Sequence, residues 1–148
     1  MKRELSIPVL AALLHGVFAA LSAATMYGVL ARFAEQAEIE VLVLIGAPAL
    51  LATVIALVIF RRAGDRIRNV SQALSRGLLV AVLTWIGFGA LSTWAWCVPE
   101  LYGECFRHTL LITGTMVGGQ LLLGCLAAAA ITGYAIRTRE ARARAERA

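Results

Sequence analysis

Three cysteines carry the most reactive side chains of this sequence. Cys97 and Cys105 flank the segment Val-Pro-Glu-Leu-Tyr-Gly-Glu, in which Pro99 and Gly103 favour a chain reversal. In an oxidising compartment two such cysteines can form a disulfide, provided that their Cα atoms approach to about 4.4–6.8 Å. We predict a structural disulfide here, and a catalytic thiol relay is the alternative. Cys125 lies deep in an apolar segment and is expected to remain reduced.

His15 and Gln120 are polar side chains within otherwise apolar segments. An ionisable group inside a membrane-spanning helix is a functional suspect, because its burial is costly. The alternative is a structural role, since such side chains also form hydrogen bonds between helices. We take His15 and Gln120 as a candidate intramembrane polar site and leave both roles open. His108 lies at the opposite depth from His15, so the two histidines are not expected to share a haem.

Motifs for other chemistry are missing from the sequence. It contains no phosphate-binding loop, no metal-ligand spacing and no serine-nucleophile motif. Glu100, Glu104 and His108 are close in sequence, but glutamates in a loop beside a bilayer usually face water. We therefore predict neither a metal nor a cofactor, and we favour a protein that is not an enzyme.

Four long apolar segments must position these residues. Each has about 20 or more residues and no Asp, Glu, Lys or Arg, and a bilayer core about 30 Å thick needs roughly 20 apolar residues per helix. The segments are residues 6–31, 41–60, 77–97 and 109–136. The sequence is 60% hydrophobic, which leaves too little polar surface for a soluble domain of this size. We predict an all-α membrane protein, a four-transmembrane-helix bundle in one polytopic domain.

The charged residues distinguish the two sides of the predicted membrane domain. Basic residues gather at the N-terminus, in the second connection and in the C-terminal tail: Lys2, Arg3, Arg61, Arg62, Arg66, Arg68, Arg76, Arg137, Arg139, Arg142, Arg144 and Arg147. The other two connections hold Arg32 and Arg107 beside Glu35, Glu38, Glu40, Glu100 and Glu104. Positive residues stay on the cytoplasmic side during insertion. We therefore predict cytoplasmic termini and a cytoplasmic segment 61–76, with 32–40 and 98–108 external.

The same basic residues bear on partners and on location. We interpret them as a topology signal that also attracts anionic lipids at the cytoplasmic face, rather than as a nucleic-acid-binding surface. The abundance of Arg, Ala and Gly is typical of a bacterial GC-rich genome. The expected location is the inner membrane of a bacterium.

Small residues mark two candidate helix-packing faces. In the first segment they recur at a spacing of four: Ala12, Gly16, Ala20, Ala24 and Gly28. Residues four apart lie on nearly one helix face, and small side chains there allow a second backbone to approach closely. In the fourth segment Gly114 and Gly118 form a GxxxG motif, which is a weak signal by itself.

The second connection also shows a helical pattern. Gly64 can end the second helix, and Asp65 can cap a new one. Ile67, Val70 and Leu74 then recur at intervals of three and four. This pattern predicts a short basic amphipathic helix at the inner membrane surface, either separate or continuous with the third span.

In span number and external cysteines the chain resembles four-span thiol oxidoreductases, the bacterial disulfide-bond oxidase and vitamin K epoxide reductase families. Those families typically carry a reactive CxxC and a second cysteine pair, whereas Cys97, Cys105 and Cys125 provide neither. In span number the chain also resembles small multidrug transporters. These need a membrane-embedded Glu in the first span, and residues 6–31 contain none.

Three functional hypotheses follow from these patterns. The first is a non-enzymatic inner-membrane protein that associates with a membrane partner or with itself through its helices, as an accessory subunit or a toxin-immunity protein. The second is an oligomeric channel or small-solute transporter lined by His15, Gln120 and hydroxyl side chains. The third is a membrane thiol-redox protein that uses Cys97 and Cys105. The missing chemical motifs favour the first hypothesis.

Overall fold

The described part of the chain is entirely helical. The computed structural model describes residues 6–33, 41–63, 67 and 69–147, and these contain no strand. The elements in chain order are α1 (Ile7–Phe33), α2 (Val41–Ala63), α3 (Val70–Trp96), the 3₁₀ turn η2 (Pro99–Leu101), α4 (Tyr102–Thr113), the π-helical segment η3 (Gly114–Gly118) and α5 (Gly119–Ala145).

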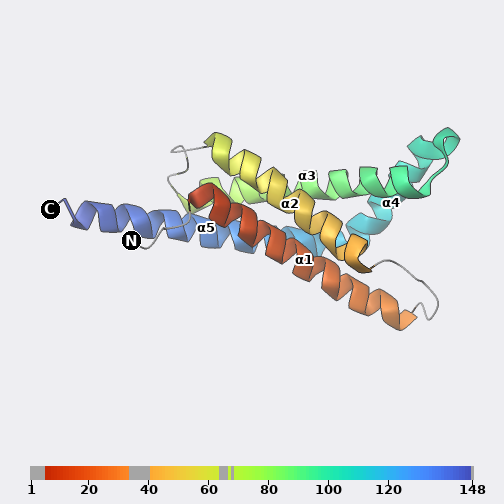
Figure 1. Ribbon diagram of the computed structural model, residues 1–148, viewed down its shortest axis with the longest axis horizontal. Helices are drawn as coiled ribbons and strands as arrows, with labels where there is room; N and C mark the ends of the chain where they lie inside the picture. The colour runs from red at the N-terminus through yellow and green to blue at the C-terminus, as the bar shows by residue number, and fades with distance from the viewer. Residues whose placement is uncertain (1–5, 34–40, 64–66, 68, 148) are drawn as a thin grey trace.

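The four long helices form a ring of antiparallel neighbours. The main contacts join α1 to α2, α2 to α3, α3 to α5 and α5 back to α1, and the α1–α2 contact is the most extensive. Figure 1 shows that α1 begins, α2 ends, α3 begins and α5 ends on the same side of the molecule. We call this side the basic end, because Arg61, Arg62, Arg137 and Arg139 lie on these helix ends. The arrangement is an up-down-up-down bundle.

Small side chains fill most of the interior. The fully buried alanines come from all four long helices: Ala11, Ala52, Ala56, Ala73, Ala128 and Ala129. Phe60 is the largest side chain that is fully buried. Because a lipid environment provides little hydrophobic drive between helices, close backbone packing across small residues is the expected source of cohesion.

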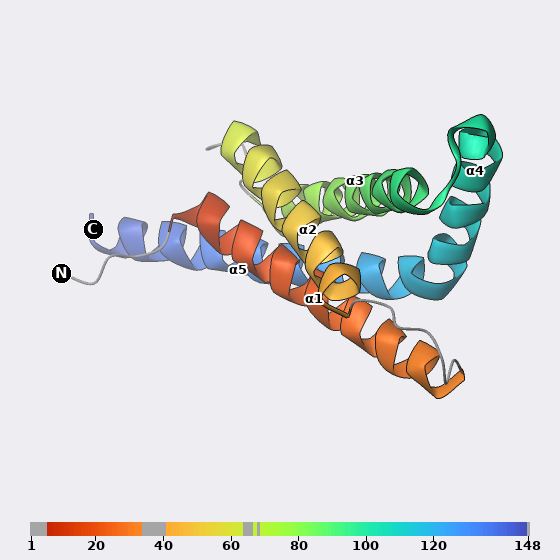
Figure 2. The ribbon, with the colours of Figure 1, turned by 45° about the vertical axis from the view of Figure 1, so that its right-hand side comes forward.

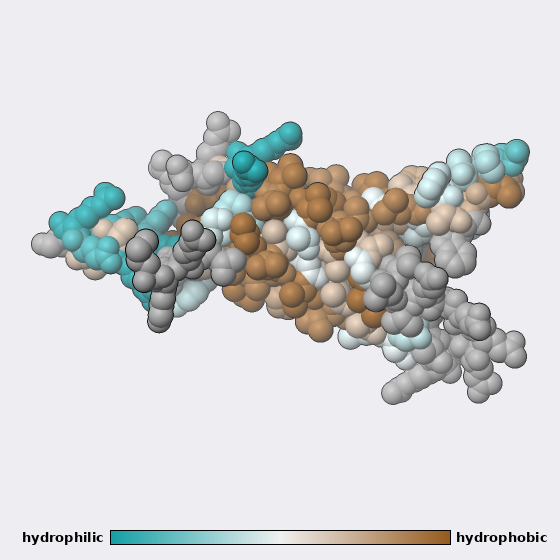
Figure 3. Space-filling view, viewed as in Figure 1, coloured by the Kyte–Doolittle hydropathy of each residue, from teal (hydrophilic) through white to brown (hydrophobic). Residues whose placement is uncertain are grey.

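The outer faces of the bundle are apolar. Exposed residues on the first three helices include Leu13, Val17, Leu21, Leu50, Val54, Val58, Leu78, Leu79 and Leu83. On the face that Figure 3 presents, hydrophobic residues cover the middle of the molecule and hydrophilic residues lie near the basic end. Four helices are long and apolar enough to cross a membrane, at Ile7–Thr25, Ile45–Ala63, Val70–Ala95 and Gly119–Ala145. These features indicate an integral membrane protein.

The start of α3 corrects the predicted helix cap. Asn69, not Asp65, caps this helix, and its side chain accepts a hydrogen bond of 2.8 Å from the backbone N–H of Gln72. Val70 and Leu74 thus belong to the first turns of α3, continuous with the third span. Gly64 and Asp65 themselves lie outside the described residues. Asn is as good an N-cap as Asp, so the cap residue alone did not determine the helix start.

The fourth predicted span is also corrected. Residues 109–136 do not form one straight helix, because η3 interrupts the α-helical hydrogen bonding between α4 and α5. Figures 1 and 2 show α4 running at a steep angle to α5. The straight apolar helix begins only at Gly119. Hydropathy records the length of a segment without charges, and it does not register a change of helix type within that segment.

Candidate functional site

His15 is a polar ring buried in the core. It is fully buried in α1, and its Nδ1 lies 2.7 Å from the carbonyl oxygen of Ala11. A carbonyl oxygen only accepts, so Nδ1 carries the proton and a neutral ring presents a lone pair at Nε2. Nε2 is buried and has no hydrogen-bond partner among the described residues. The ring packs against Phe60 of α2, with the two centroids 5.5 Å apart.

Gln120 belongs to a different polar cluster. Thr25 Oγ1 donates a hydrogen bond of 2.7 Å to Gln120 Oε1, and Ser22 Oγ lies 3.2 Å from the backbone oxygen of Gln120. Thr25 is ten residues after His15, which corresponds to about 15 Å along the axis of α1. The structure therefore joins Gln120 to the C-terminal half of α1 and does not bring it to His15.

The cavities between the helices follow the same division. The cavities that stand out among the described residues are lined neither by His15 nor by Gln120. His15 faces Phe60, whereas Gln120 faces Thr25. None of these cavities connects the two groups.

The first half of the small-residue face on α1 packs within the chain. Ala12 and Gly16 are buried. A Cβ added at Gly16 would collide with the Oγ1 atom of Thr53 on α2. A glycine at this position therefore permits the close approach of α1 and α2.

The second half of this face is open. Ala20 is half-buried, whereas Ala24 and Gly28 are exposed. A Cβ added at Gly28 would meet no atom within 4 Å, and the same holds at Gly119 of α5. Within the described residues, this part of α1 has small side chains and no close helix neighbour against them.

Gly114 and Gly118 are the first and last residues of η3 rather than a face of a straight α-helix. A Cβ added at Gly114 would lie 2.9 Å from the indole ring of Trp85 on α3. The Trp85 Nε1 donates to Thr113 Oγ1 at 3.0 Å, directly before η3. Gly114 therefore makes room for Trp85 where α4 meets η3, and Gly118 has no comparable contact with another helix.

The cysteines are arranged as one pair and one isolated thiol. Cys97 and Cys105 form a disulfide between the end of α3 and α4, with Cα atoms 6.5 Å apart, which confirms the predicted pairing. Cys125 is buried in α5 and lies next to Gly77 of α3. A Cβ added at Gly77 would be 2.9 Å from the carbonyl oxygen of Cys125. Gly77 precedes Cys97 by about 30 Å along α3. The third thiol is thus far from the disulfide.

The acidic residues and His108 near the start of α4 are not arranged as metal ligands. His108 Nδ1 lies 2.9 Å from the carbonyl oxygen of Glu104 in its own helix. Across the described ranges, no three His, Cys, Asp or Glu residues gather as metal ligands.

Sequence reasoning did not single out Phe60 or Asn69. Phe60 looks like any other apolar residue of its segment, and only the packing places it beside His15. Asn69 did carry a signal, because an Asn followed three residues later by Gln72 resembles a capping box.

Comparisons with protein-family models, with curated proteins and with solved structures find no match for this chain. A proposal for the function therefore rests on the residues and contacts of the chain itself.

Proposed function

We propose that this protein acts without enzymatic activity, through helix–helix association with a partner in the membrane. The surface that binds the partner is the α1–α5 face, which we define by the exposed residues Ala24, Thr25, Gly28, Gly119 and Gln120. Three of these residues are small enough to let a further helix approach closely, and two can form hydrogen bonds with it. The partner is another membrane protein or a second copy of this chain.

The exposed hydrogen bond between Thr25 and Gln120 carries this proposal. Thr25 lies six residues before the end of the charge-free segment at Ala31, about 9 Å along the helix. Both side chains are exposed at this depth, and apart from its bond to Thr25 the side-chain amide of Gln120 has no hydrogen-bond partner among the described residues. A polar group that faces hydrocarbon without a partner is costly. A second helix across this face would cover it.

The location of the partner follows from the charge distribution. We propose that the basic end lies in the cytoplasm and that the protein resides in a bacterial inner membrane. The support is the gathering of arginines at one end of α2, α3 and α5, which matches the positive-inside rule.

Photocrosslinking tests the proposed face in native membranes. A photoreactive amino acid at position 24 should yield a protein–protein adduct, and the same probe at Leu79 on the exposed face of α3 should yield lipid adducts only. If the probe at position 24 yields lipid adducts and no adduct with a second protein, the proposal is contradicted.

Two substitutions test the contribution of single residues to association. Gln120→Leu should lower the adduct yield by about threefold, because one hydrogen bond between membrane helices contributes about 0.6 kcal/mol. Gly28→Leu should reduce it further by preventing close approach. Gly46→Leu is the matched control, since Gly46 is also open but lies on α2. An equal loss for Gly28→Leu and Gly46→Leu would argue against a specific face.

A further inference from the structure

The side-chain amide of Gln120 has hydrogen-bonding capacity that its own chain does not use. Thr25 Oγ1 donates to Gln120 Oε1 at 2.7 Å. An amide side chain offers two acceptor lone pairs and two N–H donors, so one lone pair and both N–H groups remain without a partner among the described residues. Gln120 is exposed, and so is Leu123, one turn further along α5. The amide therefore faces lipid acyl chains, where water does not satisfy it.

An amide with a free donor and a free acceptor is complementary to a second amide of the same kind. Two such groups can form a pair of N–H···O hydrogen bonds, in which each amide donates once and accepts once. In a contact with twofold symmetry, a residue on the axis meets the same residue of the other copy. Gln120 is thus chemically suited to a contact with its own counterpart.

The membrane gives two copies of the chain a common orientation. The same basic residues orient every copy during insertion, so a twofold axis between two copies runs along the membrane normal. Each residue then meets its counterpart at its own depth. The second Gln120 lies at the required depth by symmetry, whereas an unrelated protein must carry a polar group at this depth in one of its own helices. This geometry favours a second copy as the partner.

The remainder of the α1–α5 face permits the contact. A Cβ added at Gly28 or at Gly119 would meet no atom within 4 Å, and Ala24 is exposed. These small residues allow a second backbone to approach closely. Leu21 and Leu123 are 56% and 69% exposed and extend the face toward the middle of the helices. None of the residues that define the face carries a charge, so two copies of it do not repel each other.

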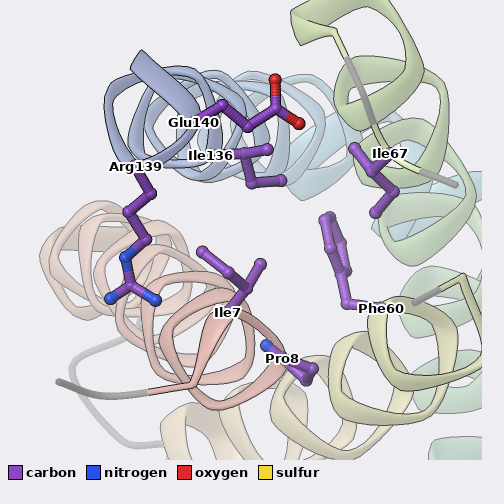
Figure 4. Close-up of a pocket in the computed structure, with 7 residues that line it drawn as sticks. All are labelled: Ile7, Pro8, Phe60, Ile67, Ile136, Arg139 and Glu140. Atoms are coloured by element: carbon purple, nitrogen blue, oxygen red, sulfur yellow. The ribbon is translucent and has the colours of Figure 1, made fainter. Parts of the chain in front are cut away.

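The basic end of the bundle is less suited to contact between two copies. Arg61, Arg62 and Arg137 are exposed there. Figure 4 shows part of this end, where Arg139 and Glu140 of α5 lie beside an otherwise apolar cavity. Two copies in the same orientation would bring exposed arginines to the same depth, and like charges repel. Self-association is therefore favoured in the half of the bundle that contains Gln120.

We propose that this protein forms a homodimer in the membrane through its α1–α5 face, with the two Gln120 side chains paired by amide hydrogen bonds on the twofold axis. This inference rests on the α1–α5 face proposed above and adds the identity of the partner and the central contact with it.

Cysteine cross-linking of the full-length protein in native membranes tests the dimer. In a Cys125→Ser background, Gly119→Cys should give a covalent dimer when the membranes are oxidised with copper phenanthroline. Gly46→Cys is the matched control, because Gly46 is equally open but lies on α2, and it should stay monomeric. If Gly119→Cys does not fold, Ala24→Cys takes its place. Monomer alone from a folded variant, or equal dimer from Gly46→Cys, would overturn the proposal.

Substitutions of Gln120 test the pairing on the axis. Gln120→Leu should lower the dimerisation constant by about eightfold, because two hydrogen bonds of about 0.6 kcal/mol each are lost per dimer. Fluorescence transfer between labelled copies at increasing lipid dilution measures this constant. A constant unchanged in folded Gln120→Leu would overturn the pairing.

A charge exchange tests whether the two side chains face each other. In the Gly119→Cys background, Gln120→Glu alone places two carboxylates opposite each other, and Gln120→Lys alone places two ammonium groups there. Each should lose the cross-linked dimer, whereas co-expression of the two variants with different tags should restore a mixed dimer. An intact Cys97–Cys105 disulfide and unchanged helical content establish that each variant is folded. A mixed dimer no more abundant than the dimer of either variant alone would overturn the proposal.

The photoadduct at position 24 separates this inference from the proposed function. An adduct of two copies of the chain, identified by peptide mapping, supports the homodimer. An adduct with a different protein leaves the α1–α5 face as the binding surface and overturns the homodimer. Lipid adducts alone overturn both.

Discussion

His15 is a polar residue in the core, and its own helix provides one hydrogen-bond partner for it. Its bond to the Ala11 carbonyl satisfies one ring nitrogen without any contribution from another helix. The second nitrogen is buried next to Phe60 without a described partner. A buried nitrogen without a hydrogen bond destabilises the fold. Either this nitrogen has a functional role, or the packing of the ring compensates for the cost.

Two substitutions of His15 separate these explanations. His15→Phe keeps a ring against Phe60 and removes the unpaired nitrogen, so we expect thermal stability in detergent to be retained. His15→Ala leaves a cavity and should cost about 2–5 kcal/mol. Thermal unfolding followed by circular dichroism measures both. If His15→Phe proves as unstable as His15→Ala, the ring nitrogens are required for folding.

The folded His15→Phe variant also tests proton transport. No fixed charge lies within the four predicted apolar segments, so we expect no proton-coupled flux. Vesicles containing the wild-type protein should keep their internal pH when solutes are added, as a trapped pH dye reports. A proton-dependent flux that disappears in His15→Phe would make His15 a proton-handling residue and would favour the transporter hypothesis.

At the scale of helices, glycines decide how closely the elements approach. A Cβ added at Gly77 of α3 would lie 2.5 Å from Ala129 Cβ and 2.9 Å from the Cys125 carbonyl oxygen. The second contact is with backbone, which cannot rotate away. A Cβ at Gly87 on the same helix would meet only Leu51 side-chain atoms at 3.7 Å.

Gly77→Ala should therefore separate α3 from α5 and cost about 1–3 kcal/mol through overpacking. Gly87→Ala is the control, because it adds the same methyl group at an ordinary contact distance. Comparative unfolding in detergent measures the difference. Equal stability of the two variants would mean that the α3–α5 approach is looser than described.

The α3–α4 hairpin depends on a covalent link as well as on packing. The disulfide Cys97–Cys105 has a sequence separation of 8, and closing a loop of this size stabilises a fold by roughly 2–4 kcal/mol. Cys97→Ser/Cys105→Ser should lower the unfolding temperature, while Cys125→Ser should leave peptide mapping of the linked pair unchanged. Recovery of free thiols at both positions in protein kept from reductants would contradict the pairing.

For the whole molecule, the separation of charge gives an orientation that can be measured. We expect the basic end to be cytoplasmic, and the disulfide and buried Cys125 leave little background for thiol labelling. Ala37→Cys should react with an impermeant maleimide added outside, whereas Ser71→Cys should react only after the membrane is opened. Labelling of both positions from the same side would overturn the four-span topology.

Hydropathy and charge were sufficient for the helical class and the number of apolar helices, because both depend on composition summed over about 20 residues. The disulfide was predictable for a similar reason, since Pro99 and Gly103 favour a turn between its cysteines. The bend at Gly114–Gly118 was not, because neither hydropathy nor charge reports a π turn or the contact of Gly114 with Trp85 of another helix.

The candidate sites were less predictable than the fold. His15 stood out by type, but its neighbour Phe60 follows only from the alignment of α1 with α2. Likewise, Gln120 was recognised as polar, whereas its partner Thr25 and its exposure required the packing of α5 on α1. Single-sequence patterns identify unusual residues, and the contacts between distant segments determine which of them meet.

The π-helical segment η3 makes this protein sensitive to length as well as to sequence. A π turn closes its hydrogen bond over one more residue than an α turn does. Loss of a single codon within residues 114–118 would replace the π turn by a regular α turn, would let α4 and α5 merge into one straight helix, and would swing α4 out of its steep angle to α5. Cys105 would then turn away from Cys97, although no chemical group of the pair had changed. We thus expect the Cys97–Cys105 disulfide and the length of η3 to be conserved together. Single-residue deletions within η3 should be tolerated less well than substitutions.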